Sequence, residues 1–222
     1  MTEGSNSASG RPPIWSSGLI LAVLAAVCTA LVAITQRNTA PRIAANEQAY
    51  LEQSLQPVLA GLSYDGKLSE STLTIPPPHD LPGNEAVTIY RVFADNKAVA
   101  ALFVVTARDG FSGPIKLLIG IAADGSITGV RVLEHRETPG LGDLIEASRS
   151  DWINQFARTS INFPARDQWT IKRDGGVFDQ LTGASITPRA VVKAIKETLL
   201  YFEANSEQVF AVAEVEASGP EQ

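Results

Sequence analysis

The sequence predicts an α+β protein, with one N-terminal transmembrane helix followed by a soluble domain whose mainly antiparallel sheet is packed by helices. Three observations lead to this prediction. An uncharged apolar run lies near the start of the chain, paired strand patterns joined by tight turns fill its middle, and a helical pattern follows near its end. The 222 residues suffice for one ordinary domain beside a membrane helix.

The apolar run extends from Pro12 to Gln36 without a charged residue. As a helix it would rise about 37 Å, more than the roughly 30 Å of a hydrocarbon core. The alternative is a cleaved signal peptide, whose apolar region is shorter, about 7–15 residues, and ends in a small-residue cleavage site. The length favours an uncleaved anchor at 14–36 behind a short tail at 1–13. The few flanking basic residues do not decide its orientation.

Residues 37–85 are expected to form a juxtamembrane helix and a loop. In the segment 43–60, apolar residues recur on one helical face, and Gly61 follows. The segment 74–83 holds a run of three prolines and a Pro-Gly pair, a composition typical of a loop.

Residues 86–203 are expected to form the main domain. Four strand patterns stand in its first half, at 87–93, 98–106, 115–122 and 127–133. Asp124-Gly125 between the last two is a strong signal for a tight hairpin turn. Because adjacent strands joined by tight turns run in opposite directions, the pattern predicts an antiparallel sheet.

The second half of this domain is predicted to be mixed. A helix is expected at 143–157 and a short strand at 169–172. Thr187 is expected to be the N-cap, and Pro188 the first residue, of a last helix that runs to about Glu203. Its buried face would hold Ala190, Val191, Ala194, Ile195, Thr198 and Leu199. Residues 204–222 then form an acidic tail.

Composition excludes several classes of function. The formal net charge of −6 argues against nucleic-acid binding, which requires a basic surface. The single cysteine, Cys28, excludes a disulfide framework and Cys-ligated zinc or iron–sulfur sites. With two histidines, His79 and His135, a His-rich metal centre is not expected either. The sequence therefore predicts no metal site.

Two stretches, 134–142 and 172–187, mix glycines with polar residues, so a backbone can come close to a ligand there. The second stretch leads into a helix N-terminus, which favours an anion such as a phosphate, and it carries the hydroxyls of Ser185 and Thr187. The alternative is that Thr187 is simply an N-cap and the glycines are turns. A triad of Ser185, His135 and an aspartate lacks the nucleophile-elbow sequence, so no catalytic residue is expected.

These two stretches carry a resemblance to a known family. Asp179-Gln-Leu-Thr-Gly-Ala-Ser185 resembles the flavinylation motif of membrane electron-transport flavoproteins, and His135-Arg-Glu-Thr-Pro-Gly-Leu-Gly142 resembles the second signature of the same FMN-binding domain. In this order, behind one N-terminal span, they resemble the RnfG family of the Rnf ion-translocating electron-transport complex. The equivalent flavin-binding subunit of the sodium-pumping NADH:quinone reductase is a close sibling.

The resemblance implies that FMN is joined through a phosphoester to Ser185, where most relatives have threonine. Asp179 matches the acidic residue that the flavin transferase needs, and Thr182 is the other hydroxyl residue of the motif. Gly183 and Ala184 would let the phosphate approach the main chain.

The second signature implies a flavin-facing loop made by Glu137, Thr138, Leu141 and Gly142, while Thr187 would cap the helix under the phosphate. FMN is thus the implied cofactor.

The resemblance further implies a covalent-FMN electron carrier in a complex that couples ferredoxin–NAD electron transfer to ion movement. Such a protein is a redox member of a translocase and not a stand-alone catalyst. Its implied partners are membrane and iron–sulfur subunits, and it would sit in the cell inner membrane with its domain in the periplasm. The alternatives are the equivalent subunit of the quinone reductase and a membrane-tethered binding module without flavin, which would be colourless.

Overall fold

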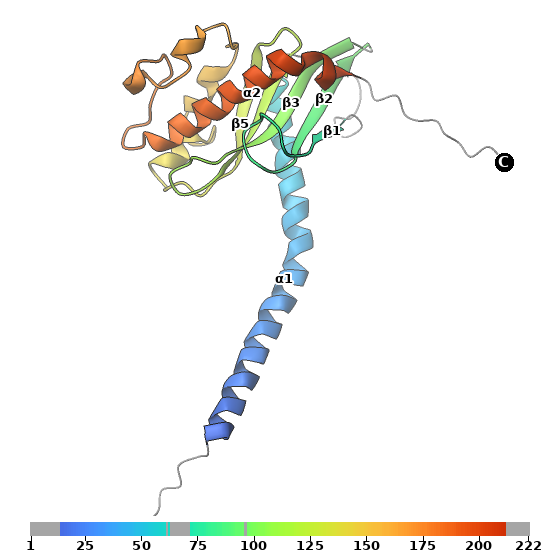
Figure 1. Cartoon of the computed structure of the whole chain (residues 1–222), viewed down its shortest axis with the longest axis vertical. Coiled ribbons are helices and arrows are strands. Elements are labelled where there is room, and N and C mark those ends of the chain that lie inside the picture. Colours follow the sequence, from blue (N-terminus) through green and yellow to red (C-terminus); the bar gives the residue numbers. More distant parts are fainter. Residues whose placement is uncertain (1–13, 61, 63–71, 96, 212–222) are drawn as a thin grey trace, which may run out of the picture. The chain divides into compact units, whose positions relative to one another are not determined.

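The computed structural model describes residues 14–60, 62, 72–95 and 97–211 (Figure 1). The chain divides into two compact units, Met1–Ala49 and Tyr50–Gln222. The expected tails at 1–13 and 212–222 lie outside the described residues.

The first unit is the N-terminal part of helix α1 (Ile14–Val58). Its segment Gly18–Ile43 is long and apolar enough to cross a membrane, and none of it is buried within the protein. The expected apolar helix is therefore confirmed, but a separate helix at 43–60 is wrong, because α1 continues without a break past Pro41. Proline removes one helical hydrogen bond, and the alanines around it are strong helix formers that let the helix continue.

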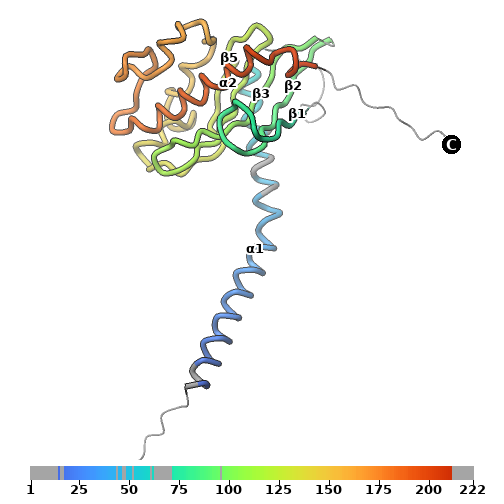
Figure 2. The backbone as a smooth tube through the Cα atoms, viewed as in Figure 1, coloured from blue at the N-terminus to red at the C-terminus, as the bar shows by residue number. Residues whose placement is uncertain are grey.

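The second unit is built on a five-stranded antiparallel sheet in the order β1-β2-β3-β4-β5. The strands are β1 (Thr72–Ile75), β2 (Val87–Ala94), β3 (Lys97–Ala107), β4 (Ile115–Ala122) and β5 (Ile127–Glu134). The four predicted strands are confirmed, as Figure 2 lets the reader follow along the backbone. Strand β1 falls partly in the segment predicted as a loop. Its alternating Thr-Leu-Thr-Ile pattern pairs with β2, and the prolines that follow end it.

Side chains alternate between the two faces of the sheet, and each face has its own core. Leu102 and Leu118 face one side, where they pack with Leu55, Val58 and Leu59 at the end of α1. The other face, which includes Phe103 and Ile119, is covered by α2 (Ile186–Phe210) and the segments before it (Figure 1).

Helix α2 buries the face that the sequence predicted, since all six of its expected core residues are buried. It also extends beyond Glu203 to Phe210, with non-helical dihedral angles at Asn205. Val209 is buried and Phe210 packs edge-on against Phe202, so core contacts keep the last turns folded.

The predicted helix at 143–157 is wrong. The segment instead holds two short 3-10 helices, η2 (Gly142–Ile145) and η3 (Trp152–Phe156). The predicted strand at 169–172 is also wrong, because only Ile171 makes an isolated bridge, to Phe178. The reason in both cases is an aromatic cluster that buries side chains at irregular intervals, and its members are Trp152, Phe156, Trp169 and Phe178.

Candidate functional site

The two glycine-containing stretches meet at the N-terminus of α2. The hydroxyl of Thr187 donates a hydrogen bond of 2.5 Å to Oε2 of Glu137, and both side chains are buried. Gly142 fits tightly beside them, since an added Cβ would lie 2.8 Å from Glu137 Oε2 and 3.2 Å from Thr187 Oγ1. A side chain at this position would push the two stretches apart.

The N-cap of α2 is Ser185, not Thr187 as the sequence predicted. The hydroxyl of Thr187 is turned inward to Glu137 and so does not cap the helix. Ser185 is half-buried, and its side chain makes no cap bond either. Its Oγ instead accepts a hydrogen bond of 2.9 Å from the guanidinium of Arg173. The structure therefore holds one hydroxyl between a guanidinium and a helix N-terminus.

Asp179 has a fixed backbone and an exposed side chain. Its carbonyl accepts a hydrogen bond of 2.6 Å from the indole of Trp152, and its N–H donates to Gln155 at 2.7 Å. Its carboxylate faces outward and forms a 2.5 Å ion pair with Lys172. The motif thus presents an accessible acidic group on a rigid main chain.

Other ion pairs brace the same region. Arg189 on the first turns of α2 pairs with Asp174 at 2.5 Å, and this contact lowers the pKa of the Asp174 carboxyl and raises that of the Arg189 guanidinium. Both groups are fully exposed, so the pair serves mainly to orient the loop beside Ser185.

Leu141 lies over Gly183. The backbone of Gly183 has φ +82°, and a Cβ added there would lie 2.9 Å from Leu141 Cδ2. Leu141 is 42% exposed, and Thr138 and Thr182 are exposed. Ala184 is half-buried, and its N–H donates to Leu181. An apolar side chain and two hydroxyls therefore border the open surface beside Ser185.

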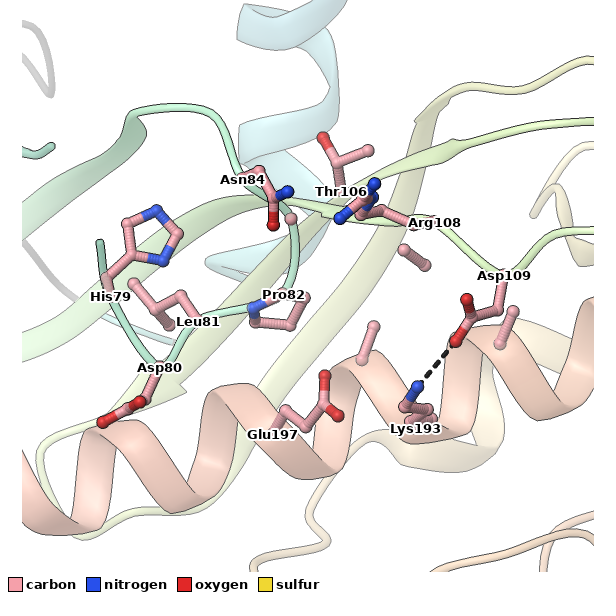
Figure 3. A pocket seen from close by; sticks show the side chains of 14 residues that line it. His79, Asp80, Leu81, Pro82, Asn84, Thr106, Arg108, Asp109, Lys193 and Glu197 are labelled. Carbon is pink, nitrogen blue, oxygen red and sulfur yellow. Dashed lines mark hydrogen bonds and ion pairs between the residues drawn. The ribbon is translucent and has the colours of Figure 1, made fainter. Parts of the chain in front are cut away.

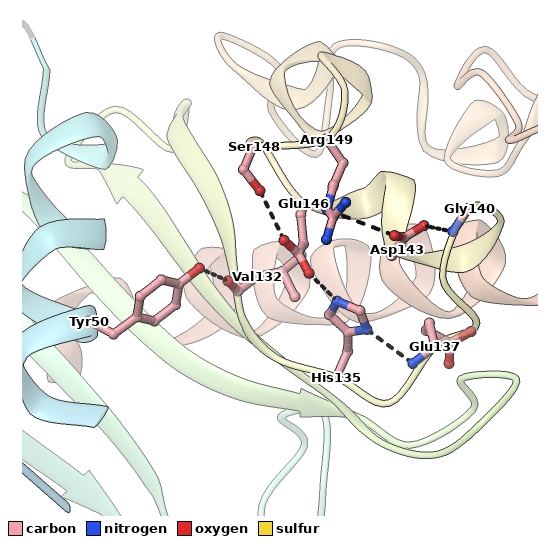
Figure 4. A network of polar contacts seen from close by, with 9 residues as sticks. All are labelled: Tyr50, Val132, His135, Glu137, Gly140, Asp143, Glu146, Ser148 and Arg149. Atoms are coloured by element: carbon pink, nitrogen blue, oxygen red, sulfur yellow. Dashed lines mark hydrogen bonds and ion pairs between the residues drawn. The ribbon is translucent and has the colours of Figure 1, made fainter. Parts of the chain in front are cut away.

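A polar network fixes the loop after β5 (Figure 4). His135 accepts the N–H of Glu137 at its Nδ1 (3.0 Å), so its ring proton lies on Nε2 and is donated to Glu146 (2.7 Å). Together with the hydroxyl of Ser148, this contact holds the pKa of Glu146 below its usual range. Both ring nitrogens of His135 are engaged here, and Ser185 bonds to Arg173, so the triad considered from the sequence is not formed.

The carboxylate of Glu137 is directed into the protein. Oε2 accepts the Thr187 hydroxyl and Oε1 accepts the N–H of Ser112 at 3.0 Å. Glu137 thus joins three segments instead of facing the open surface. Nearby, the carboxylate of Asp143 accepts the N–H of Gly140 at 2.7 Å and helps to fix the same loop.

Sequence reasoning did not single out Arg173, because a basic loop residue is ordinarily solvated and no local pattern marks it. A separate cleft of about 660 Å³ lies farther along α2, between residues 79–84 and the end of β3 (Figure 3). None of the predicted site residues lines it. In the described part of the chain, no three His, Cys, Asp or Glu side chains are grouped to hold a metal ion.

These residues suit FMN by their chemistry. Arg173 and the helix N-terminus offer positive charge to a phosphate, Gly183 allows close approach, and Leu141 offers an apolar contact to a ring. Fold and site together define an FMN-binding domain behind an N-terminal apolar helix. The model of the FMN-binding domain matches residues 110–200, and that of the RnfG N-terminal region matches residues 1–58.

Three relatives carry names that make each of them a subunit of an ion-translocating oxidoreductase complex. The protein of Pseudoalteromonas atlantica is 39% identical, over 90% of this chain and 93% of its own. That of Shewanella baltica is 38% identical, over 91% and 95%. That of Pseudomonas aeruginosa is 39% identical, over 93% and 97%. The chain therefore belongs to the RnfG family and is one component of a multi-subunit oxidoreductase complex.

Proposed function

We propose that this chain is a membrane-anchored electron carrier whose FMN is attached through a phosphoester to the hydroxyl of Ser185. The observation that carries the proposal is the position of this hydroxyl, which is half-buried at the N-cap of α2 and 2.9 Å from the Arg173 guanidinium. A phosphodiester keeps one negative charge, which both the helix N-terminus and Arg173 stabilise.

The attachment needs an activated donor, because a phosphate monoester has no good leaving group. A flavin dinucleotide is that class of donor. The bond between Ser185 Oγ and the FMN phosphorus forms, the pyrophosphate P–O bond breaks, and a nucleoside monophosphate leaves. The hydroxyl proton passes to a base of the flavin transferase. Asp179, exposed beside the site, is the residue that the transferase would recognise.

The other site residues bind or position the cofactor. Gly183 and Ala184 leave room for the phosphate along the main chain, and Thr182 adds a hydroxyl at the surface. Bound FMN supplies transfer of one or two electrons, and the protein supplies orientation and electrostatics.

On the flavin-facing side, Thr138 and Leu141 present exposed groups. Glu137, Gly142 and Thr187 are buried and act by holding that loop against α2.

In the complex, this protein would pass electrons between iron–sulfur and membrane subunits during ferredoxin–NAD electron transfer coupled to ion movement. Its anchor would lie in the inner membrane and its domain in the periplasm. The side is tested by replacing Cys28 with serine and labelling an introduced cysteine, Ala147→Cys, with a membrane-impermeant maleimide in intact spheroplasts. Labelling before lysis supports the periplasmic side, and labelling only after lysis contradicts it.

The covalent link is tested by flavin fluorescence of the denatured chain on a gel, after co-expression with a flavin transferase. Wild type should fluoresce, Ser185→Ala should be dark, and the matched control Thr182→Ala should fluoresce. Fluorescence in Ser185→Ala would move the attachment to Thr182, since Thr187 is fully buried. Darkness in all three, with a control protein labelled, would favour the colourless binding module over the carrier.

A further inference from the structure

The loop between β3 and β4 is held at two points beside the proposed flavin site. The carboxylate of Asp109 pairs with Lys193 of α2 at 2.6 Å (Figure 3), and the N–H of Ser112 donates to Oε1 of Glu137 at 3.0 Å. Gly110 lies between them with no space for a side chain, since an added Cβ would lie 2.9 Å from Glu137 Oε1 and still closer to the Gly113 carbonyl oxygen. The loop is thus fixed on both flanks.

Between these two anchors lies Phe111, whose side chain is 65% exposed. Apolar surface left in water forgoes about 25 cal/mol per Å² of burial energy, and a phenyl ring has a large surface. Because Asp109 and Ser112 are both bound, the loop cannot turn Phe111 into the core without breaking one of these contacts. The fold therefore keeps an aromatic ring available to a ligand.

The carboxylate of Glu137 sets the distance between Phe111 and the attachment residue. One oxygen binds Ser112, next to Phe111, and the other binds Thr187, two residues beyond Ser185. A cofactor joined to Ser185 therefore starts on the same small patch of surface as Phe111. Two more exposed apolar side chains flank this patch, Leu141 at 42% and Ile186 at 46% exposure.

We propose that the ring of Phe111 packs against the isoalloxazine of the FMN held at Ser185 and shields it from water. The inference rests on the proposed function, because it requires the flavin at that site. An isoalloxazine is a flat, largely apolar aromatic system, and aromatic pairs favour offset stacked or edge-to-face contacts. Phe111 would then be a binding residue on a segment that neither glycine-containing stretch includes.

The experiment uses the full chain, flavinylated by co-expression with a transferase, and introduces an indole as a quencher. Phe111→Trp is compared with Phe163→Trp, because Phe163 is also an exposed phenylalanine, at 73%, but lies in a turn that bonds to Ser160 and not to Glu137. An indole in contact with a flavin quenches its fluorescence by electron transfer. The three native tryptophans are common to all variants, so differences arise from the introduced one.

Covalent flavin per chain is first measured by fluorescence of the denatured protein, and then the fluorescence lifetime is measured in the native protein. The lifetime should shorten severalfold in Phe111→Trp and remain as in wild type in Phe163→Trp. In Phe111→Ala, quenching by iodide should become stronger than in wild type.

Equal flavin content with unchanged lifetime and iodide quenching in the Phe111 variants would overturn the contact while leaving the proposed function intact. Absence of flavin from denatured wild type would instead overturn the proposed function, and this inference with it.

Discussion

The hydroxyl of Thr187 donates a 2.5 Å hydrogen bond to the carboxylate of Glu137, and both groups are buried although the residues are 50 positions apart in the chain. This contact fastens the first turn of α2 to the loop after β5. Because Glu137 also binds Ser112, a single carboxylate fixes the relative positions of three segments around Ser185.

Removing the hydroxyl should destabilise the domain. Thr187→Val keeps the shape but leaves a buried carboxylate oxygen without its donor, so we expect the free energy of unfolding to fall by about 1–3 kcal/mol. Thr198→Val is the matched control, since Thr198 is equally buried but donates only to the carbonyl of Ala194 in its own helix. Urea unfolding of both variants measures the difference, and an equal loss in the two would contradict a special role for the Thr187 contact.

Neutralising the carboxylate should change the flavin without preventing its attachment. Ser185 bonds to Arg173 and not to Glu137, so Glu137→Gln should keep wild-type flavin content. The amide has one acceptor oxygen for two donors, so either the Ser112 or the Thr187 contact weakens and the loop beside the flavin shifts. The visible absorption spectrum should therefore differ from wild type, while Glu134→Gln, at an exposed position, should not alter it. An unaltered spectrum in Glu137→Gln would remove this residue from the surroundings of the flavin.

Gly183→Ala should impair flavin attachment, in contrast to the same change at Gly125. Both glycines have left-handed backbones, φ +82° and φ +84°, so alanine should cost about 1–2 kcal/mol of stability at either position. Only at Gly183 would the new methyl meet Leu141, since nothing lies within 4 Å of the corresponding position at Gly125. Unfolding and denatured-state flavin fluorescence should show similar stability losses but reduced flavin only in Gly183→Ala. Equal flavin content in the two would argue against a close approach at Gly183.

Stability should depend on pH through Glu146. Its pKa in the folded protein is lowered by the hydrogen bond from His135, so its contribution is complete above the ordinary value of 4.5 and is lost as the pH falls through the lowered value. Glu146→Gln should therefore be less stable than wild type at pH 7, and the gap should narrow below pH 4.5. Thermal unfolding from pH 7 to pH 3 measures the gap, with Glu207→Gln as an exposed control. A gap that stays constant with pH would contradict the ionised hydrogen bond.

The elements that depend on local patterns were predictable. Strands β2 to β5 could be recognised because each is a continuous apolar or alternating run next to a tight turn, and the buried face of α2 follows the helical period. Strand β1 was missed because four residues before a proline run carry little signal, and it exists only by pairing with β2. The helix predicted at 143–157 failed because Trp152 and Phe156 are buried in an aromatic cluster and not along a helical face.

The sequence by itself determined the apolar helix, the antiparallel sheet, the family and the segments that form the site, because these depend on composition, periodicity and short motifs. Only the tertiary structure decided that Ser185 is the N-cap, that Thr187 and Glu137 turn inward to each other, and that Arg173 reaches the Ser185 hydroxyl. The physical reason is that a side-chain hydrogen bond depends on where the backbone of two distant segments comes to rest. That placement is set by burial of the whole core and is not encoded in the spacing of the residues that form the bond.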